Sequence, residues 1–174
     1  WTHSLETALF AKYLANEHPK KRLLPSAFVS GLLHDIGRLV MYIKAPDLAR
    51  SADLLAQSGQ LNKIDAEVST FGFSHADIGG ALLELWKIPE SIQSAATFHH
   101  QPELATTHQE EALLIHLANR LTHTDTSSEE TIMLELPPED SAWLNSDLAY
   151  GIITHVIKEK EEEFNRTYQL FFGS

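Results

Sequence analysis

Residues 30–40 read SGLLHDIGRLV and place His34 and Asp35 side by side inside an otherwise apolar run. Burying an unpaired charge is costly, so such a pair in a folding core needs a partner. A ring nitrogen and a carboxylate oxygen from one turn of helix form half of a site for a borderline metal ion. Ile36 and Gly37 follow directly, and they predict that the helix ends or kinks there and exposes both ligands to a cavity.

Apolar residues recur at helical spacing along almost the whole chain, which predicts an all-α fold of about eight helices. The predicted helices cover residues 1–15, 25–35, 39–44, 46–58, 63–71, 75–86, 89–100, 109–124 and 146–168. Ser74 followed by Asp77 resembles a capping box at the start of one of them. The segment 124–140, TDTSSEETIMLELPPED, is predicted to be a loop.

Length and charge limit the classes of function. The 174 residues suffice for one domain with its own core. The net charge of −11 argues against binding to nucleic acid or to an anionic membrane, because both reward clustered Lys and Arg. A phosphate-containing ligand is compatible with this charge if a divalent cation reverses the local field. With no cysteine, a metal would be held by His, Asp, Glu or water. No membrane-spanning run or signal-peptide pattern is present, so the expected location is cytoplasmic.

Ten histidines are present, and their positions matter more than their number. Five lie at predicted helix ends or among apolar residues: His3, His34, His75, His99 and His100. His18 and His108 have polar neighbours, so we expect them at the surface. Adjacent residues on a helix point about 100° apart, so His99 and His100 could both bind a metal only where the helix frays. One packed and one exposed ring is the alternative for this pair.

Four stretches carry a family resemblance: WTHSLETALFAKYLA (1–15), AFVSGLLHDIGRLVM (27–41), FGFSHADIGGALLELWKIPESIQSAATFHHQPE (71–103) and EEALLIHLANRLTH (110–123). Together they resemble the HDOD subgroup of the HD superfamily of metal-dependent phosphohydrolases, a signalling relative of the HD-GYP cyclic-dinucleotide phosphodiesterases. No nucleophile elbow, P-loop or dinucleotide motif competes with this reading. The four stretches span residues 1 to about 124 and leave the C-terminal helices unassigned, and we expect residues 1–174 to form one HD-type helical bundle. The resemblance also implies that this bundle is the C-terminal part of a longer protein.

The resemblance implies two metal positions that share Asp35. The first would be formed by His3, His34, Asp35 and Asn119, and the second by His75, His99, His100 and the bridging Asp35. The implied cofactor is one or two divalent ions of iron, manganese, zinc or magnesium. In two-metal relatives the ions activate a water and steady the phosphoryl oxygens, so His34 and Asp35 would be the catalytic residues.

Two departures from the family pattern bear on activity. Asn119 offers a neutral amide oxygen where the family has an Asp, and HHQPE lacks the Gly-Tyr-Pro loop of the cyclic-dinucleotide enzymes. Arg38 and Arg120 are the nearest candidates for a phosphate contact, although each also fits an ordinary charge on a helix surface.

Three functions therefore stay open. The first is a metal-binding signalling module with weak or no catalysis, and we favour it. The second is a metal-dependent phosphohydrolase or phosphodiesterase acting on a nucleotide or cyclic dinucleotide, and the third is a purely structural helical domain. The expected partners are a phosphoester or nucleotide ligand and signalling proteins, with neither nucleic acid nor a membrane among them.

Overall fold

A computed structural model describes residues 2–20, 25–126, 128–137 and 141–172, with the backbone alone at 129 and 167–172. Trp1, at the start of the first motif, lies outside the described residues. Every regular element in these ranges is a helix, which confirms the predicted all-α fold. The elements are α1 (Thr2–Glu17), α2 (Ala27–Leu33), α3 (Ile36–Lys44), α4 (Pro46–Gln57), α5 (Lys63–Phe71), α6 (His75–Leu85), α7 (Glu90–Phe98), η2 (Pro102–Leu104), α8 (Gln109–His123), α9 (Glu129–Glu135), α10 (Ser141–Asn145), η3 (Tyr150–Ile152) and α11 (Ile153–Phe172).

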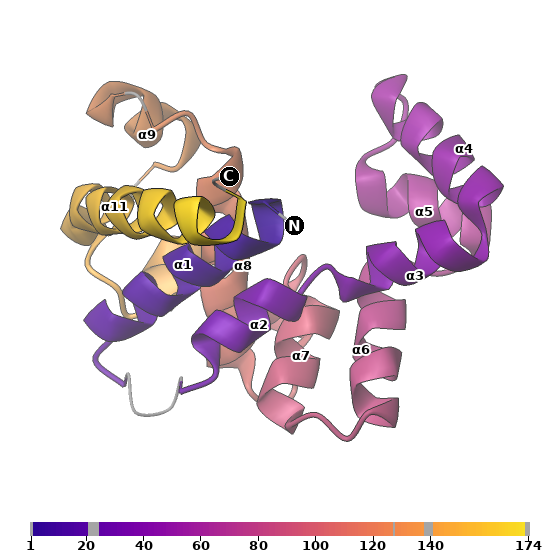
Figure 1. Ribbon diagram of the computed structural model, residues 1–174, viewed down its shortest axis with the longest axis horizontal. Coiled ribbons are helices and arrows are strands. Elements are labelled where there is room, and N and C mark those ends of the chain that lie inside the picture. The colour runs from indigo at the N-terminus through magenta and orange to yellow at the C-terminus, as the bar shows by residue number, and fades with distance from the viewer. Residues whose placement is uncertain (1, 21–24, 127, 138–140, 173–174) are drawn as a thin grey trace.

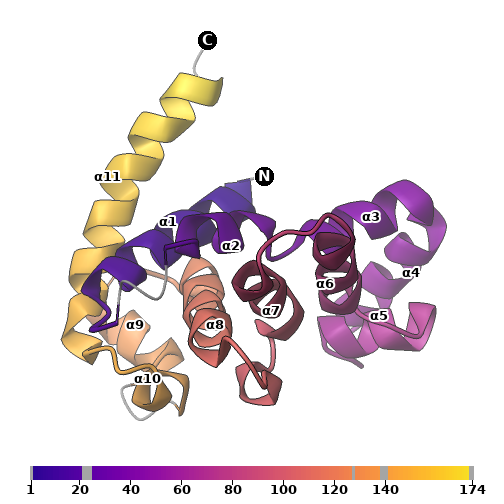
Figure 2. The same ribbon diagram turned by 90° about the horizontal axis from the view of Figure 1, so that it is seen from below.

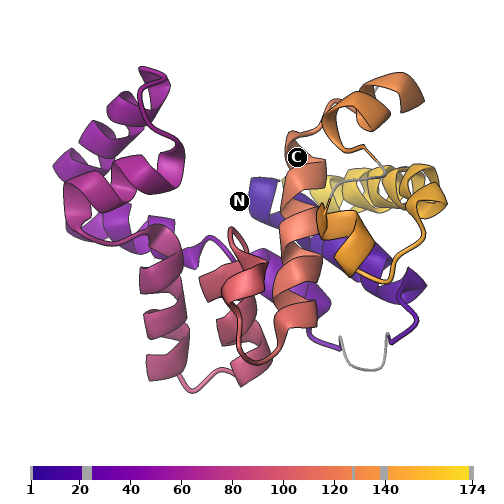
Figure 3. The ribbon, with the colours of Figure 1, turned by 180° about the vertical axis from the view of Figure 1, so that it is seen from behind.

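The helices form two groups, with α6 and α7 between them (Figure 1). In one group α1 packs against α2, α8 and α11, and in the other α3 packs against α4 and α4 against α5. Seen from below, α8, α7 and α6 stand in a row that leads from the first group to the second (Figure 2). The view from behind shows α3, α4 and α5 set apart from the α1–α8–α11 group (Figure 3).

Most of the buried apolar side chains belong to the α1–α8–α11 group. Phe10, Leu14, Leu117, Leu121 and Val156 are all fully buried in one cluster there. Burying a side chain of this size stabilises the fold by about 1.5–3 kcal/mol relative to exposing it. By contrast, the apolar residues buried on α4 and α5 are alanines, so the second group has the smaller core.

Two glycines let helices approach more closely than any side chain would allow. A Cβ atom on Gly31 would lie 2.6 Å from the Cα atom of Ala8, so α2 packs directly on α1. A Cβ atom on Gly37 would lie 1.9 Å from the carbonyl oxygen of His75, so the start of α3 packs on the start of α6. Both contacts flank the turn at residues 34 and 35 and fix its position.

The predictions for the C-terminal third are wrong in two places. The segment 124–140 contains the helix α9, which begins after Ser128, whose side chain accepts a hydrogen bond from the backbone N–H of Thr131. Ile132 and Leu136 lie one turn apart and are both buried, so the short apolar run is helical rather than part of a loop. The last helix begins at residue 153 instead of 146. Asp147 has a φ of 58°, a left-handed conformation that is incompatible with a helix continuing through residue 147.

Among the residues that the structure describes, no helix combines the length and the apolar composition needed to cross a bilayer.

Candidate metal centre

Helix ends carry the residues of the candidate site. They are His34 and Asp35 in the turn between α2 and α3, His75 at the start of α6, and His99 and His100 after the end of α7. The break at residues 34 and 35 is the one that the sequence predicts. The predicted capping box is also present, with the Ser74 side chain accepting from the Asp77 backbone and the Asp77 carboxylate accepting from the Ser74 backbone.

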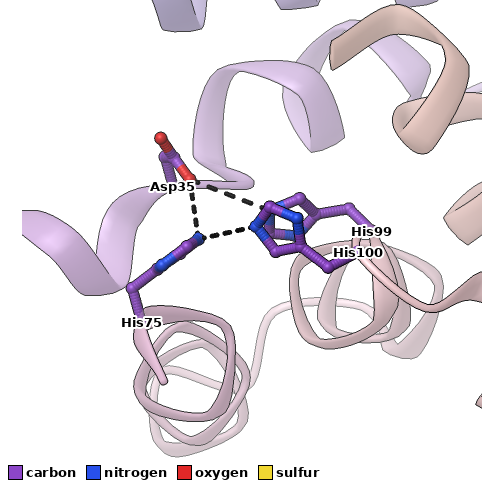
Figure 4. Close-up of side chains that lie close together, drawn as sticks. All are labelled: Asp35, His75, His99 and His100. Carbon is purple, nitrogen blue, oxygen red and sulfur yellow. Dashed lines mark hydrogen bonds and ion pairs between the residues drawn. The ribbon is translucent and has the colours of Figure 1, made fainter. Parts of the chain in front are cut away.

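The imidazoles of His75, His99 and His100 lie close together beside Asp35 (Figure 4). Oδ1 of Asp35 lies 3.0 Å from Nε2 of His75 and 3.8 Å from Nε2 of His99. Nε2 of His100 lies 3.1 Å from Nε2 of His75. One ligand atom from each of these four residues fits within a span of 4.8 Å. His99 and His100 therefore both turn their rings toward the site, rather than one ring being packed and the other exposed.

His3, His34 and Asp35 form a second group whose side-chain atoms could hold a metal. Nε2 of His3 is 3.3 Å from Nε2 of His34 and 3.9 Å from Oδ2 of Asp35. Nε2 of His34 is 3.7 Å from Oδ1 of the same carboxylate. Asp35 is therefore shared by two clusters. Six of the seven residues expected at the site come together in this way.

Hydrogen bonds fix which ring nitrogen faces the site. His34 and His99 each donate Nδ1–H to the backbone carbonyl three residues earlier, at 2.7 and 2.8 Å. His75 donates Nδ1–H to Oε2 of Glu67 at 2.7 Å. Carbonyl and carboxylate oxygens only accept hydrogen bonds, so the proton sits on Nδ1 in all three rings. With Nδ1 held by an acceptor, Nε2 of each ring faces Asp35 and is the nitrogen that could bind a metal, as in most histidines that bind metals.

Burial and neighbouring charges set the protonation of the site. Burial, with a smaller effect of neighbouring histidines, lowers the pKa of His3 and of His100 to about 4. Burial also opposes ionisation of Asp35, but the hydrogen bond with His75 and the nearby imidazoles hold the pKa of this carboxyl far below its usual range. His75 is the exception among the rings, because hydrogen bonds with Asp35 and Glu67 outweigh its burial and raise its pKa.

The donor atoms fit a divalent metal ion. Among the described residues, four buried side-chain polar atoms have no hydrogen-bond partner, and two of them, Nε2 of His99 and Oδ1 of Asn119, belong to residues expected at the site. Leaving such an atom unpaired costs about 1–3 kcal/mol. Ligand atoms that surround one ion at 2.0–2.2 Å are roughly 3–4 Å apart, and the distances around Asp35 lie in this range. Imidazole nitrogen with carboxylate oxygen suits zinc, iron and manganese.

Comparison with known protein families identifies the fold. The family model of the HDOD domain matches residues 1–102, which is more than half of the chain. The chain belongs to the HDOD family. An uncharacterized protein of Treponema pallidum (strain Nichols) is 30% identical to this HDOD chain over 102 residues, which cover 58% of the chain and 20% of that relative.

Solved structures share the fold of this HDOD chain at low sequence identity. An HDOD domain protein of unknown function from Geobacter sulfurreducens has a TM-score of 0.76 at 22% identity over 99% of the chain. A "Putative phosphohydrolase" from Shewanella amazonensis SB2B has a TM-score of 0.64, and a "Putative signal transduction protein" from Marinobacter aquaeolei VT8 has 0.68. Both are 18% identical over 95% of the chain. The HDOD chain spans 62%, 62% and 38% of these three proteins, in that order.

Asn119, the seventh expected residue, lies on the side of α8 that faces the site. Nδ1 of His116, three residues earlier, donates to the carbonyl of His99 at 2.8 Å. Oγ1 of Thr122, three residues later, lies 3.3 Å from Nδ1 of His3. Residues three apart share one face of a helix, so Asn119 stands between two residues that touch the cluster. Its buried, unpartnered Oδ1 agrees with that position.

Three contributors to the site were not predicted from the sequence. Glu67 is buried and bonded to His75, and the ring of His123 stacks on that of His3 with centroids 5.0 Å apart. The hydroxyl of Thr122 donates to the carbonyl of Asn119 at 2.6 Å, so it accepts from His3. Of these three, only Glu67 could have been noticed in the sequence. It is a carboxylate on the same helix face as the apolar residues 64, 68 and 71, where an apolar side chain is expected.

The expectation for His18 is wrong, and that for His108 is confirmed. His18 is 4% exposed, since its Nε2–H donates to the carbonyl of Ser146 at 2.8 Å while Nδ1 accepts from the backbone of Lys20. These bonds join the end of α1 to the segment after α10. His108 is exposed, at the start of α8.

An open cleft of about 560 Å³ adjoins the first cluster. His3 and Asp35 form part of its wall, together with Arg38, Tyr42 and His123. A guanidinium nitrogen of Arg38 lies 3.3 Å from Oδ2 of Asp35, so Arg38 is both near the cluster and open to the cleft. Arg120, the other expected phosphate contact, donates to the carbonyl of Glu135 at 3.3 Å and does not line this cleft.

Proposed function

We propose that this HDOD chain is a metal-binding regulatory module with two metal positions that share Asp35. One observation carries the proposal. The buried Nε2 atoms of His34, His75 and His99 all lie within 3.8 Å of Oδ1 of Asp35, while the Nδ1 atom of each ring is held by an acceptor. Three rings oriented in the same sense toward one carboxylate are a costly arrangement for a core and a useful one for a cation.

The residues divide between the two positions as the clusters do. The first would be held by His3, His34, Asp35 and the amide oxygen of Asn119, and the second by Asp35, His75, His99 and His100. A divalent ion at either position supplies a Lewis acid that polarises a phosphoryl oxygen and lowers the pKa of a bound water. The chain supplies the orientation of the rings and an anionic Asp35 that balances the charge.

Three features favour regulation over catalysis. Asn119 brings no negative charge to the first position, and this weakens its hold on a hard divalent ion. The stretch after His100 lacks the Gly-Tyr-Pro loop of the cyclic-dinucleotide enzymes, and the net charge is −11. One relative in structure is named a "Putative signal transduction protein", in keeping with a role in signalling.

A metal-dependent phosphohydrolase is the second candidate, and the cleft favours it. The cleft of about 560 Å³ reaches Asp35 and is bordered by Arg38, whose guanidinium suits a phosphate oxygen. A phosphoester or nucleotide would enter there with its phosphate toward the first metal position. Another relative in structure is named a "Putative phosphohydrolase".

Turnover by the metal-loaded protein decides between the two. The protein would be loaded with Mn²⁺, Fe²⁺ or Zn²⁺ and assayed against a panel of phosphomonoesters, nucleotides and cyclic dinucleotides. Metal bound without turnover supports the regulatory module. Turnover that disappears in Asp35→Ala and survives in His108→Ala supports the enzyme and overturns the first proposal.

A further inference from the structure

Glu67 is a buried carboxylate that neither metal position uses as a ligand. Its side chain is 6% exposed, and its atom Oε2 accepts two hydrogen bonds from one residue, His75. The ring Nδ1–H donates at 2.7 Å and the backbone N–H at 2.8 Å. Glu67 thus reaches from the middle of α5 to the first residue of α6.

Packing alone does not account for a carboxylate at this position. Removing a carboxylate from water costs several kcal/mol, and only good partners offset that cost. In the part of the chain that the structure describes, the ion pair of Glu67 within 4.0 Å is with His75. An apolar side chain would fill the same space at a lower cost. The carboxylate therefore acts on His75.

The contacts of His75 differ from those of the other two oriented rings. His34 and His99 donate Nδ1–H to neutral backbone carbonyls, whereas His75 donates it to a charged carboxylate. A charged acceptor makes the opposite ring nitrogen a stronger electron donor and holds the ring more firmly. That nitrogen, Nε2, is the atom of His75 that lies 3.0 Å from Asp35.

We propose that Glu67 is the positioning residue of the second metal position. It fixes the ring plane and the Nδ1–H tautomer of His75 and strengthens Nε2 as a ligand. The inference rests on the proposed function, because it assumes that His75 binds a metal. It adds a residue of α5 to a site whose ligands come from other elements.

Zinc titration of two variants tests the inference. Glu67→Gln keeps an oxygen that can accept both hydrogen bonds but removes the charge, and Glu67→Ala removes both. Calorimetric titration of the metal-free protein with Zn²⁺ should show the second position weakened about 10- to 100-fold in Glu67→Ala. A smaller loss is expected in Glu67→Gln, with the first position within twofold of wild type in both. Glu84 is an exposed carboxylate on α6, so Glu84→Gln is the matched control and should bind zinc as tightly as wild type does.

Histidine NMR separates positioning from plain packing. In protein labelled with ¹⁵N-histidine, the Nδ1–H signal of His75 should be present in wild type, weakened in Glu67→Gln and replaced by a mixture of tautomers in Glu67→Ala. His3→Ala should weaken the first zinc position and leave the His75 signal unchanged. If Glu67→Ala does not fold, Glu67→Gln carries the test.

The outcomes separate this inference from the proposed function. Wild-type zinc affinity at both positions in both variants, with the His75 tautomer unchanged, would overturn the role of Glu67 and leave the metal site intact. Wild-type protein that binds no zinc would overturn the proposed function and the inference with it. Selective loss at the second position, with an altered tautomer, supports both.

Discussion

Gly37 brings the two sides of the site together because it has no side chain. It follows Asp35 by two residues, and the carbonyl of His75 occupies the space that a Cβ atom would need. The distance of 3.0 Å between Asp35 and His75 depends on that contact. Gly37, which has no side chain to offer as a ligand, therefore sets the geometry of the candidate ligands.

Gly37→Ala should damage the site and Gly79→Ala should not. Overpacking of this kind costs about 1–3 kcal/mol, and here the obstacle is rigid backbone, so we expect the upper end in chemical denaturation and loss of zinc from the second position. On Gly79 the nearest atom to a Cβ lies at 3.5 Å, an ordinary contact, and alanine in a helix adds up to about 1 kcal/mol of stability. Equal stability of the two variants would contradict the role given to Gly37.

Asn119→Asp should strengthen the first metal position. A carboxylate would replace a neutral, buried oxygen that has no hydrogen-bond partner, and it would add a full charge for a divalent ion. Titration with Mn²⁺ should show at least tenfold tighter binding, whereas Asn119→Ala should bind more weakly than wild type. Unchanged affinity in Asn119→Asp would remove this residue from the site.

The sequence predicts most of the residues that cluster at the site, but it does not predict the residues that contact them from a distant part of the chain. The resemblance supplies the six clustered candidate ligands because all of them lie in three of the quoted stretches, as His34 and Asp35 do in 27–41. Thr122 and His123 have no such pattern, and their roles arise from contacts with His3, more than a hundred residues away. Tertiary contacts of this kind cannot be read from local spacing.

At the scale of elements, the sequence predicted helix boundaries correctly where a capping motif and a long apolar stripe occur together. The Ser74 capping box and the break at 34–35 are confirmed. Residues 124–140 contain one short apolar run followed by two prolines, and these signals predicted a loop. Helix α9 forms there because Ile132 and Leu136 are buried, since a helix of this length is not stable by itself. Such helices depend on packing that the sequence does not display.

The contact between α1 and α11 predicts a pH-dependent contribution to stability. Burial opposes ionisation of Glu163, but hydrogen bonds from Lys12 and Tyr13 lower its pKa below the ordinary 4.5. The folded pKa is below the unfolded one, so this stabilisation is full above about pH 4.5 and is lost as the pH falls through the folded pKa. The side chains of Lys12 and Glu163 are both partly exposed, so their ion pair contributes at most about 1 kcal/mol to the free energy of unfolding.

Glu163→Gln measures that contribution. Urea denaturation at pH 7 should show the variant less stable by up to about 1 kcal/mol. The difference in the free energy of unfolding between the variant and wild type should shrink as the pH falls below 4.5, because wild-type Glu163 then becomes protonated and loses its charge. A difference that stays constant down to pH 3 would show that the ion pair does not stabilise the α1–α11 contact.

At the scale of the whole molecule, the site lies where the two groups of helices meet. His3 comes from the α1 group, His75 and His99 from α6 and α7, and Asp35 from the turn that leads into α3. The α3–α5 group buries little apolar surface of its own. Shared ligands would therefore stabilise the arrangement of the two groups as well as the site.

Metal should raise the melting temperature of the protein. Zinc at 100 times its dissociation constant adds about 2.7 kcal/mol to the stability of the folded state. For a chain of this size that corresponds to a shift of roughly 5–10 °C. The shift should reverse on chelation and be absent in Asp35→Ala. An equal shift in Asp35→Ala would place the stabilising metal elsewhere.

Elemental analysis of protein purified without chelators tests the central claim most directly. We predict one to two equivalents of iron, manganese or zinc per chain. His34→Ala and Asp35→Ala should lower that content well below wild type, while His108→Ala should leave it unchanged. A value near zero that persists after reconstitution, or equal metal content in all three variants, would contradict a metal site at Asp35.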